Sequence, residues 1–466
     1  MRYVSTRGQA PVLGFEDTML AGLARDGGLY VPETVPTLSP DEIAGLAGKP
    51  YEEVAVRVMA PFVAEAFDEA TLGDLVRDAY AGFGHAARAP LVQLGPNHHL
   101  LELFHGPTLA FKDFAMQLIG RMFQHVLARR GDAVTIVGAT SGDTGSAAIE
   151  AFAGLDGVDV FILYPHGRVS DVQRRQMTTP EAANVHALAL TGHFDDCQAR
   201  VKDMFNDFGF RDRVGLAGVN SINFARVLAQ VVYYFTAATA LGAPHRPVSF
   251  CVPTGNFGDI FAGHIAKRMG LPIERLVVAT NENDILARCL DGIGDYRKHG
   301  VIPTTSPSMD IEVSSNFERA LFWAYGNDGD AVTRLMRQLD EEEGFRVAPE
   351  ALQELERHYD AMSVDEPKVS AAITEAQFEL GELICPHTAI GYHVGKRYAR
   401  RNSNVPMVTL ATAHPAKFPD AVEAATGIRP DLPARMSDLF DRPERITRVE
   451  NDLGRIEALI DERRVA

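Results

Sequence analysis

Residues 101–120, LELFHGPTLAFKDFAMQLIG, contain a single lysine, Lys112. It follows a turn, HGPT at 105–108, and opens an apolar helical pattern that runs from 111 to 123. Between Phe111 and Phe114 its amine would be partly desolvated, which lowers the pKa of a lysine and frees the amine for nucleophilic or base chemistry. Lysines are rarely buried, so the stretch taken alone favours an ordinary first-turn lysine with its amine in water.

Composition is typical of a globular protein. The chain has 466 residues, 46% hydrophobic and 23% charged, which is enough for two or more domains with a large core. Its formal net charge of −17 argues against nucleic acid or an anionic membrane as partner. A phosphorylated small molecule stays compatible with this charge, because local groups can bind an anion on an acidic protein.

Redox and targeting signals are absent from the sequence pattern. Cys197, Cys251, Cys289 and Cys385 are far apart and form no CxxC pair, so we expect neither a metal site nor a disulfide framework. The first residues, MRYVSTRGQ, lack an apolar signal core. The longest apolar run, 227–243, is short for a membrane span and predicts a buried helix. We therefore expect a cytoplasmic protein.

The chain divides by pattern into three parts. Residues 1–87 read as a small, mostly helical N-terminal domain, and residues 431–466 as a charged, peripheral segment. Between them, 88–430 alternate apolar strands with helices, which predicts an α/β fold with a largely parallel sheet. The expected strands are 133–137, 158–164, 185–190, 248–252, 276–279 and 406–411.

An insert at 281–385 interrupts this alternation. Helical patterns are visible at 316–325, 330–343 and 348–359, the last of them polar and exposed. No chemistry is assigned to the insert.

Three segments beside these elements carry residues that suit an anion. PTGNFGD at 253–259 joins a strand to a helix, and its glycines and the helix N-terminus make a phosphate cradle, although a plain strand-to-helix turn is the simpler interpretation of the loop alone. ATSGDTG at 139–145 offers hydroxyl and N–H groups suited to a carboxylate. In NSINFAR at 220–226, Asn223 caps a helix carrying Arg226, and an arginine with small polar donors is what phosphate recognition needs. A surface arginine on a capped helix is the alternative.

Several motifs together resemble one family. They are HGPTLAFKDFA at 105–115, PTGNFGD, TAHPAKF at 412–418, and the N-terminal YVSTRG at 3–8 and DGGLYVPE at 26–33. The chain is similar over nearly its whole length to the threonine synthases of the longer, fungal- and enterobacterial-type class. This resemblance implies a pyridoxal 5′-phosphate (PLP) enzyme of fold type II, tryptophan synthase β-like, with a small N-terminal domain.

The resemblance also implies roles for individual residues. Lys112 would hold PLP covalently, Asp143 would lie beside the ring near its O3′, and the Thr412 hydroxyl would meet the pyridine nitrogen. The cofactor phosphate would lie on Gly255, Asn256, Phe257 and Gly258. The substrate-binding residues would be Thr140, Ser141 and Thr144 for the carboxylate, Asn220, Ser221 and Arg226 for the phosphate, and Lys417, for which a structural role is the alternative.

The reaction implied is the conversion of O-phospho-L-homoserine and water to L-threonine and phosphate by a monomer or weak homodimer. Two alternatives stay open: another fold type II lyase such as a serine/threonine dehydratase, or a non-catalytic protein that binds a phosphorylated ligand. One departure from the family pattern is CPHTA at 385–389, where Cys385 replaces an expected aspartate.

Overall fold

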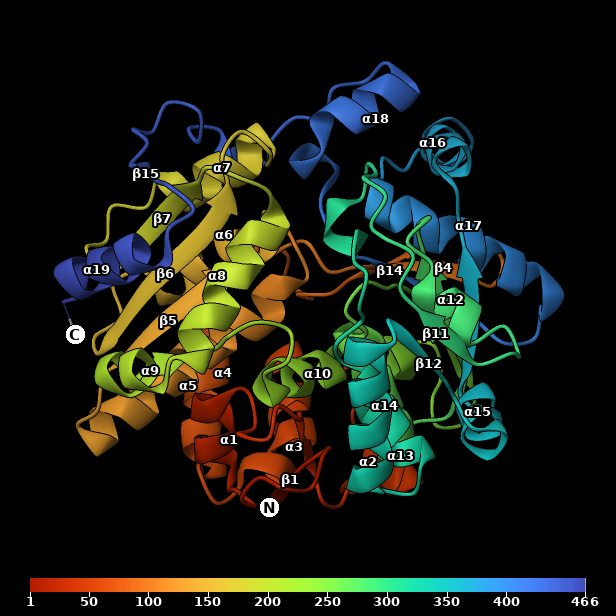
Figure 1. Cartoon of the computed structure of the whole chain (residues 1–466). Helices are drawn as coiled ribbons and strands as arrows, with labels where there is room; N and C mark the ends of the chain where they lie inside the picture. Colours follow the sequence, from red (N-terminus) through yellow and green to blue (C-terminus); the bar gives the residue numbers. More distant parts are fainter. Residues whose placement is uncertain (466) are drawn as a thin grey trace.

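The computed structural model of the chain describes residues 1–465. Two mostly parallel sheets form its core, each covered by helices (Figure 1). The six-stranded sheet has the order β13-β10-β9-β14-β4-β3, with only β3 antiparallel. Its strands are β3 (Leu91–Gln93), β4 (His98–Glu102), β9 (Val248–Pro253), β10 (Ile273–Thr280), β13 (Tyr359–Ser363) and β14 (Met407–Ala411).

The five-stranded sheet is parallel throughout and has the order β15-β7-β6-β5-β8. Its strands are β5 (Val134–Ala139), β6 (Val158–Pro165), β7 (Val185–Leu190), β8 (Leu216–Ala217) and β15 (Thr447–Val449). Every residue of β6 and β9 is buried, as expected for central strands covered on both faces. The expected α/β class and all six expected strands are confirmed.

Helices occupy much of residues 88–440 outside the 281–385 insert. They are α5 (Lys112–Arg130), α6 (Asp143–Phe152), α7 (Asp171–Thr178), α8 (Phe194–Asn206), α9 (Phe208–Val214), α10 (Phe224–Ala240), α11 (Gly258–Arg268), α17 (Pro386–Arg401) and α18 (Pro419–Thr426), with 3₁₀ turns η3 (Pro415–Lys417) and η4 (Ala434–Met436). The apolar run at 227–243 forms most of α10, which is buried along nearly its whole length. None of the helices in residues 1–465 has the length and apolar character needed to cross a membrane.

The segment after residue 430 is not peripheral, contrary to our expectation. Its strand β15 extends the five-stranded sheet beside β7, and α19 (Leu453–Arg463) packs on α8. Ile456, Leu459 and Ile460 are buried there with Val449. Charged residues between these apolar positions hid an amphipathic helix.

The N-terminal region packs against α5 and α10, the helices that carry Lys112 and Arg226 (Figure 1). It contains α1 (Phe15–Ala21), α2 (Pro40–Ala44), α3 (Tyr51–Val63), α4 (Glu69–Tyr80) and the antiparallel pair β1 (Tyr3–Ser5) and β2 (Tyr30–Pro32). Helices α1, α2 and α3 contact α10, and α4 contacts α5. The Tyr80 hydroxyl donates to the Phe114 carbonyl at 2.9 Å, which ties α4 to the first turn of α5.

The 281–385 insert is part of the architecture. It holds α12 (Ile285–Cys289), η1 (Pro307–Met309), α13 (Phe317–Ala324), α14 (Gly329–Glu341), α15 (Pro349–Glu356), α16 (Glu366–Glu375), a π-helical turn η2 (Ala376–Leu380), and the pair β11 (Asp295–Arg297) and β12 (Gly344–Arg346). The helix expected at 348–359 is shorter, its Ala351, Leu352 and Leu355 are buried, and Tyr359 opens edge strand β13. An apolar stripe at helical spacing explains the burial.

Candidate active site

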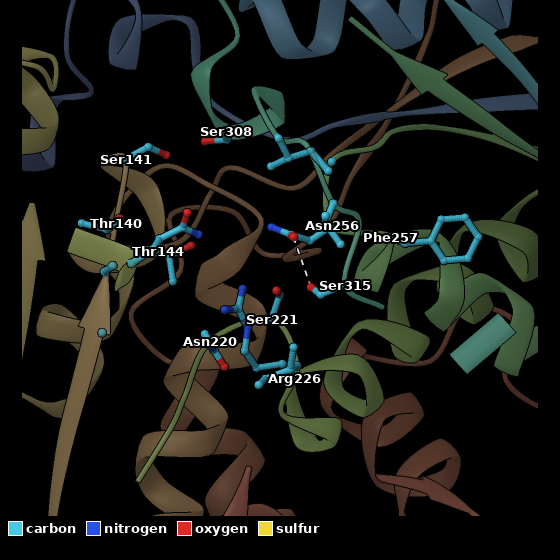
Figure 2. Close-up of a pocket in the computed structure, with 18 of the residues that line it drawn as sticks. Thr140, Ser141, Thr144, Asn220, Ser221, Arg226, Asn256, Phe257, Ser308 and Ser315 are labelled. Atoms are coloured by element: carbon cyan, nitrogen blue, oxygen red, sulfur yellow. Dashed lines mark hydrogen bonds between the residues drawn. The ribbon is translucent and has the colours of Figure 1, made fainter. Parts of the chain in front are cut away.

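Loops after four strands meet around one cavity of about 710 Å³ (Figure 2). They follow β5, β8, β9 and β14, because ligand sites in parallel sheets form beyond the carboxyl ends of strands. Thirteen of the fourteen predicted site residues line this cavity: Lys112, Thr140, Ser141, Asp143, Thr144, Asn220, Ser221, Arg226, Gly255, Asn256, Phe257, Gly258 and Thr412. Lys417 does not.

Lys112 is the first residue of α5 and is buried. Burial lowers the pKa of its amine to about 8, although Asp143 opposes this change. The Nζ atom lies 3.4 Å from both Asp143 Oδ2 and Ser308 Oγ. The Phe111 N–H donates to the Thr412 carbonyl at 2.8 Å, so the turn before the lysine is attached to the end of β14. The desolvation expected from the flanking phenylalanines is confirmed.

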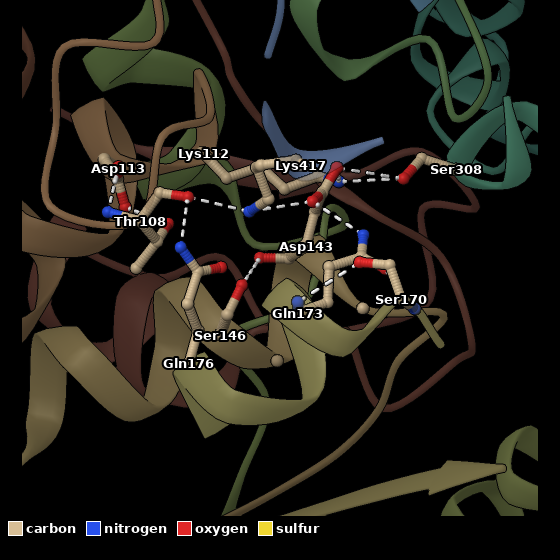
Figure 3. A network of polar contacts seen from close by, with 12 residues as sticks. Thr108, Lys112, Asp113, Asp143, Ser146, Ser170, Gln173, Gln176, Ser308 and Lys417 are labelled. Atoms are coloured by element: carbon tan, nitrogen blue, oxygen red, sulfur yellow. Dashed lines mark hydrogen bonds and ion pairs between the residues drawn. The ribbon is translucent and has the colours of Figure 1, made fainter. Parts of the chain in front are cut away.

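Asp143 begins α6 and is held at both carboxylate oxygens (Figure 3). Lys417 Nζ lies 2.9 Å from Oδ1, and Gln173 donates to the same oxygen at 3.0 Å. Ser308 donates to Oδ2 at 3.1 Å, on the Lys112 side. Burial by itself would raise the pKa of Asp143, but Lys417 and Lys112 hold it well below its usual range. The site therefore contains a fixed anion beside the reactive amine.

Lys417 lies behind Asp143 and not at the cavity wall. It is fully buried, and its Nζ donates to the Thr108 carbonyl at 2.7 Å as well as pairing with Asp143. Of the two roles open to Lys417, the structure presents the structural one and no exposed amine for the substrate. The motif TAHPAKF identified Lys417 but did not show which group its side chain contacts.

Ser308 reaches the site without a sequence signal, and His387 lies in the CPHTA segment, to which no site role was assigned. Ser308 lies in η1 of the insert, and its N–H donates to His387 Nε2 at 3.3 Å. Burial lowers the pKa of His387 to about 4, so its ring is neutral. Both line the cavity. The surrounding run of serine, proline and threonine resembles any loop, so only the folded chain reveals the contact with Lys112.

The glycine loop before α11 has the shape of an anion cradle. A Cβ on Gly255 would lie 2.9 Å from the Ser308 carbonyl, and Phe257 adopts φ of +65°. The Phe257 ring points away from the cavity and packs on Phe317, so this residue offers its backbone (Figure 2). The first turn of α11 leaves N–H groups without intrahelical partners, which suits a phosphate.

Arg226 forms a second anion-binding position, across from the Thr140 loop (Figure 2). It is buried, and its Nη1 donates to the Val219 carbonyl at 3.3 Å. Within residues 1–465 its Nε has no hydrogen-bond partner and no carboxylate lies at ion-pair distance. Burial lowers the pKa of Arg226 to about 10, which still leaves it charged at neutral pH. A buried cation without a counter-ion fits an anionic ligand.

The side-chain hydroxyls of Thr140 and Thr412 differ in whether they have a hydrogen-bond partner within residues 1–465. The Thr140 hydroxyl oxygen accepts the N–H groups of Gly142 and Gly145, both at 2.9 Å, so it shapes its own loop. Thr412 Oγ1 is buried without a partner in the described part of the chain. An unpartnered hydroxyl at the cavity wall fits the ring nitrogen of PLP.

Cys385, which stands where the family pattern led us to expect an aspartate, caps the N-terminus of α17. Its Sγ accepts the Thr388 N–H at 3.4 Å at the start of α17. All four cysteines are buried and free.

The chain is similar to known proteins along its whole length. Family models match residues 2–80 (threonine synthase N terminus), 85–412 (pyridoxal-phosphate dependent enzyme) and 388–460 (threonine synthase, C-terminal). Threonine synthase of Pseudomonas aeruginosa is 54% identical over 99% of this chain and 98% of its own, and that of Saccharomyces cerevisiae is 41% identical over 91% and 88%. The structure of PLP-bound threonine synthase from Brucella melitensis is 56% identical, covers both chains fully and superposes with a TM-score of 0.97. PLP is the cofactor, and the chain belongs to the threonine synthase family of PLP-dependent lyases.

Proposed function

We propose that the chain converts O-phospho-L-homoserine and water to L-threonine and phosphate. The observation that carries this proposal is the pair of anion positions in one cavity. The glycine loop at 255–258 suits the phosphate of PLP, and the buried Arg226 suits a second phosphate, that of the substrate. Lys112 also lines this cavity.

The cavity residues then divide by role. PLP, when bound, supplies the electron sink for loss of the substrate α-proton and departure of the γ-phosphate. Lys112 would hold PLP, the free Thr412 hydroxyl would meet its pyridine nitrogen, and Asp143 provides a fixed negative charge beside Lys112. Ser141 and Thr144, with the loop shaped by Thr140, bind the substrate carboxylate. Asn220, Ser221 and Arg226 bind the substrate phosphate.

Lys112 is suited to move protons. With a pKa of about 8, set mainly by burial, an appreciable fraction of its amine is neutral near physiological pH and accepts a proton from carbon. Asp143 lies 3.4 Å from Nζ and remains ionised, so it stabilises the amine once it is protonated. The Ser308 hydroxyl contacts both the Lys112 amine and the Asp143 carboxylate, and so fixes their relative positions.

The alternatives explain less of this geometry. A serine/threonine dehydratase needs Lys112 and the glycine loop but has no substrate phosphate to match Arg226. A non-catalytic binding protein needs the anion positions but gains nothing from a buried lysine of lowered pKa. We further propose a cytoplasmic monomer or weak homodimer without nucleic-acid or membrane partners, in which residues 1–87 form an N-terminal domain and residues 88–466 form the rest of the fold.

The deciding experiment supplies the holoenzyme with O-phospho-L-homoserine and measures phosphate and threonine together. We expect the two products in equal amounts, and neither product with Lys112→Ala. L-serine and L-threonine, offered in parallel, test for dehydratase activity through the oxo acids that it would release. Oxo acid formation without threonine synthesis would refute the proposal in favour of a dehydratase, and no turnover of any substrate would favour a binding protein.

A further inference from the structure

The loop at 218–223, which joins β8 to α10 and carries Asn220 and Ser221, is held by residues outside it. Asn223 at its end is fully buried, and its Oδ1 accepts the Ala225 N–H at 3.0 Å as the cap of α10. Its Nδ2 donates to the carbonyls of Gly218, at 3.0 Å, and Met19, at 2.8 Å. Met19 lies in α1, so one side chain joins the loop, the helix that carries Arg226, and the N-terminal domain.

A second attachment comes through Arg319. This arginine is fully buried, and its Nε donates to the Tyr30 carbonyl at 3.0 Å, while Nη2 donates to the Ile222 carbonyl at 2.6 Å. Its Nη1 contacts Asn316, whose own Nδ2 donates to the Ser221 carbonyl at 3.1 Å. No carboxylate in residues 1–465 forms an ion pair with Arg319, so backbone carbonyls and Asn316 are what satisfy it. Tyr30 belongs to β2 of the N-terminal domain.

A third contact is a close approach of two backbones. Gly22 ends α1 with φ of +65°, and a Cβ at this position would lie 2.7 Å from the Gly218 carbonyl oxygen. Only glycine allows the end of α1 to sit this close to the start of the loop. The carbonyls of Gly218, Ser221 and Ile222 are thus all engaged away from the cavity, while the Val219 carbonyl accepts from Arg226.

We propose that the N-terminal domain positions the substrate-phosphate loop, with Gly22, Asn223 and Arg319 as the positioning residues. This inference rests on the proposed function, because it assumes that the 218–223 loop and Arg226 bind the substrate phosphate. It gives the N-terminal domain a part in substrate affinity.

The test compares two glycines of the same domain. Gly22→Ala forces the Gly218 carbonyl or α1 to move, whereas Gly48→Ala introduces the same backbone strain, at φ of +72°, with nothing within 4 Å of the new Cβ. We expect Gly22→Ala to raise the KM for O-phospho-L-homoserine and the inhibition constant of inorganic phosphate about tenfold or more, as for loss of a hydrogen bond to a charged group. PLP affinity and kcat should stay within about twofold. Gly48→Ala should change none of the four.

A second variant covers a failure of Gly22→Ala to fold. Asn223→Ser keeps a good cap for α10 but is too short to reach the Met19 carbonyl, so we expect the same selective loss of phosphate affinity. Equal behaviour of Gly22→Ala and Gly48→Ala, or a parallel loss of PLP affinity and phosphate affinity, would overturn the inference.

Arg226→Ala distinguishes a failure of the proposed phosphate site from a failure of the positioning role. If it leaves phosphate inhibition unchanged, the proposed phosphate site is wrong. If it abolishes that inhibition while Gly22→Ala and Asn223→Ser do not weaken it, only the positioning role is wrong.

Discussion

Replacing Arg226 with methionine should weaken catalysis and strengthen the fold at the same time. Burial lowers the pKa of this guanidinium from its usual value to about 10, by roughly two to three pH units. At about 1.36 kcal/mol per unit, the charged form costs the folded state roughly 3 kcal/mol. This cost is fully present at neutral pH, because arginine is protonated in both states below its folded pKa. Arg226→Met removes it.

The catalytic loss has a similar size and a different origin. A phosphate left in the cavity without its charged partner costs roughly 3 kcal/mol or more, which is about a hundredfold in kcat/KM for O-phospho-L-homoserine. PLP binding should persist, because the glycine loop uses backbone N–H groups. We therefore expect Arg226→Met to keep its cofactor, lose phosphate inhibition, and unfold at a urea concentration equal to or above that of the parent.

Arg319→Met is the matched control. Arg319 is also buried, and burial lowers its pKa to about 9, but it donates to the Tyr30 and Ile222 carbonyls. Its removal leaves buried acceptors unpaired, so this variant should unfold at lower urea than the parent. Both midpoints are measured on holoenzyme in phosphate-free buffer. A fall of the Arg226→Met midpoint comparable to that of Arg319→Met, or an unchanged kcat/KM, would refute the assignment of Arg226 as a cation kept free for a ligand.

Three further substitutions test the rest of the site. Lys112→Ala should leave a folded protein that lacks the visible absorbance of lysine-bound PLP and has no turnover; near-normal turnover would contradict its role. Thr412→Val removes a buried hydroxyl that has no partner within residues 1–465, so the stability should not fall, while the absorbance spectrum of bound PLP should change if the hydroxyl meets the ring. Lys417→Met leaves Asp143 buried without its closest cation and should cost about 3–5 kcal/mol of unfolding free energy at pH 7 by urea denaturation. Because the folded pKa of Asp143 is held well below 3.8, the stability from this pair is present above about pH 4 and is lost as the pH falls further, so the parent and variant curves should converge there.

The strands could be predicted where burial is continuous. β6 and β9 are covered on both faces, so their apolar runs are visible in the sequence alone. The strands that were missed, such as β8, β13 and β15, are two to five residues long and pair at or near sheet edges. So short a strand is stabilised by its neighbour and by the helix packed beside it, and neither is encoded locally.

The site could be predicted to the same extent and for a related reason. Loops that follow central strands meet at one sheet edge, so placing the strands also brought the 139–145, 253–259 and 412–418 segments together. Ser308 escaped this reasoning because it comes from the insert and reaches Lys112 across 196 positions of sequence. No local pattern marks a contact of that kind.

A sequence motif can identify a buried basic residue, but it does not show which group that residue contacts. Lys112, Arg226 and Lys417 are all buried basic residues in or behind one cavity, and sequence reasoning assigned each to a ligand. Their partners separate them: Lys417 is neutralised by Asp143 at 2.9 Å, whereas Arg226 has no carboxylate partner in the described chain. Lys112 lies between these cases, because Asp143 is 3.4 Å away and burial keeps its pKa at about 8. A cation already paired stabilises the scaffold, one left unpaired attracts an anion, and one weakly paired can exchange a proton. The chemistry of each residue thus follows from whether a carboxylate pairs with it and how closely, which only the folded structure provides.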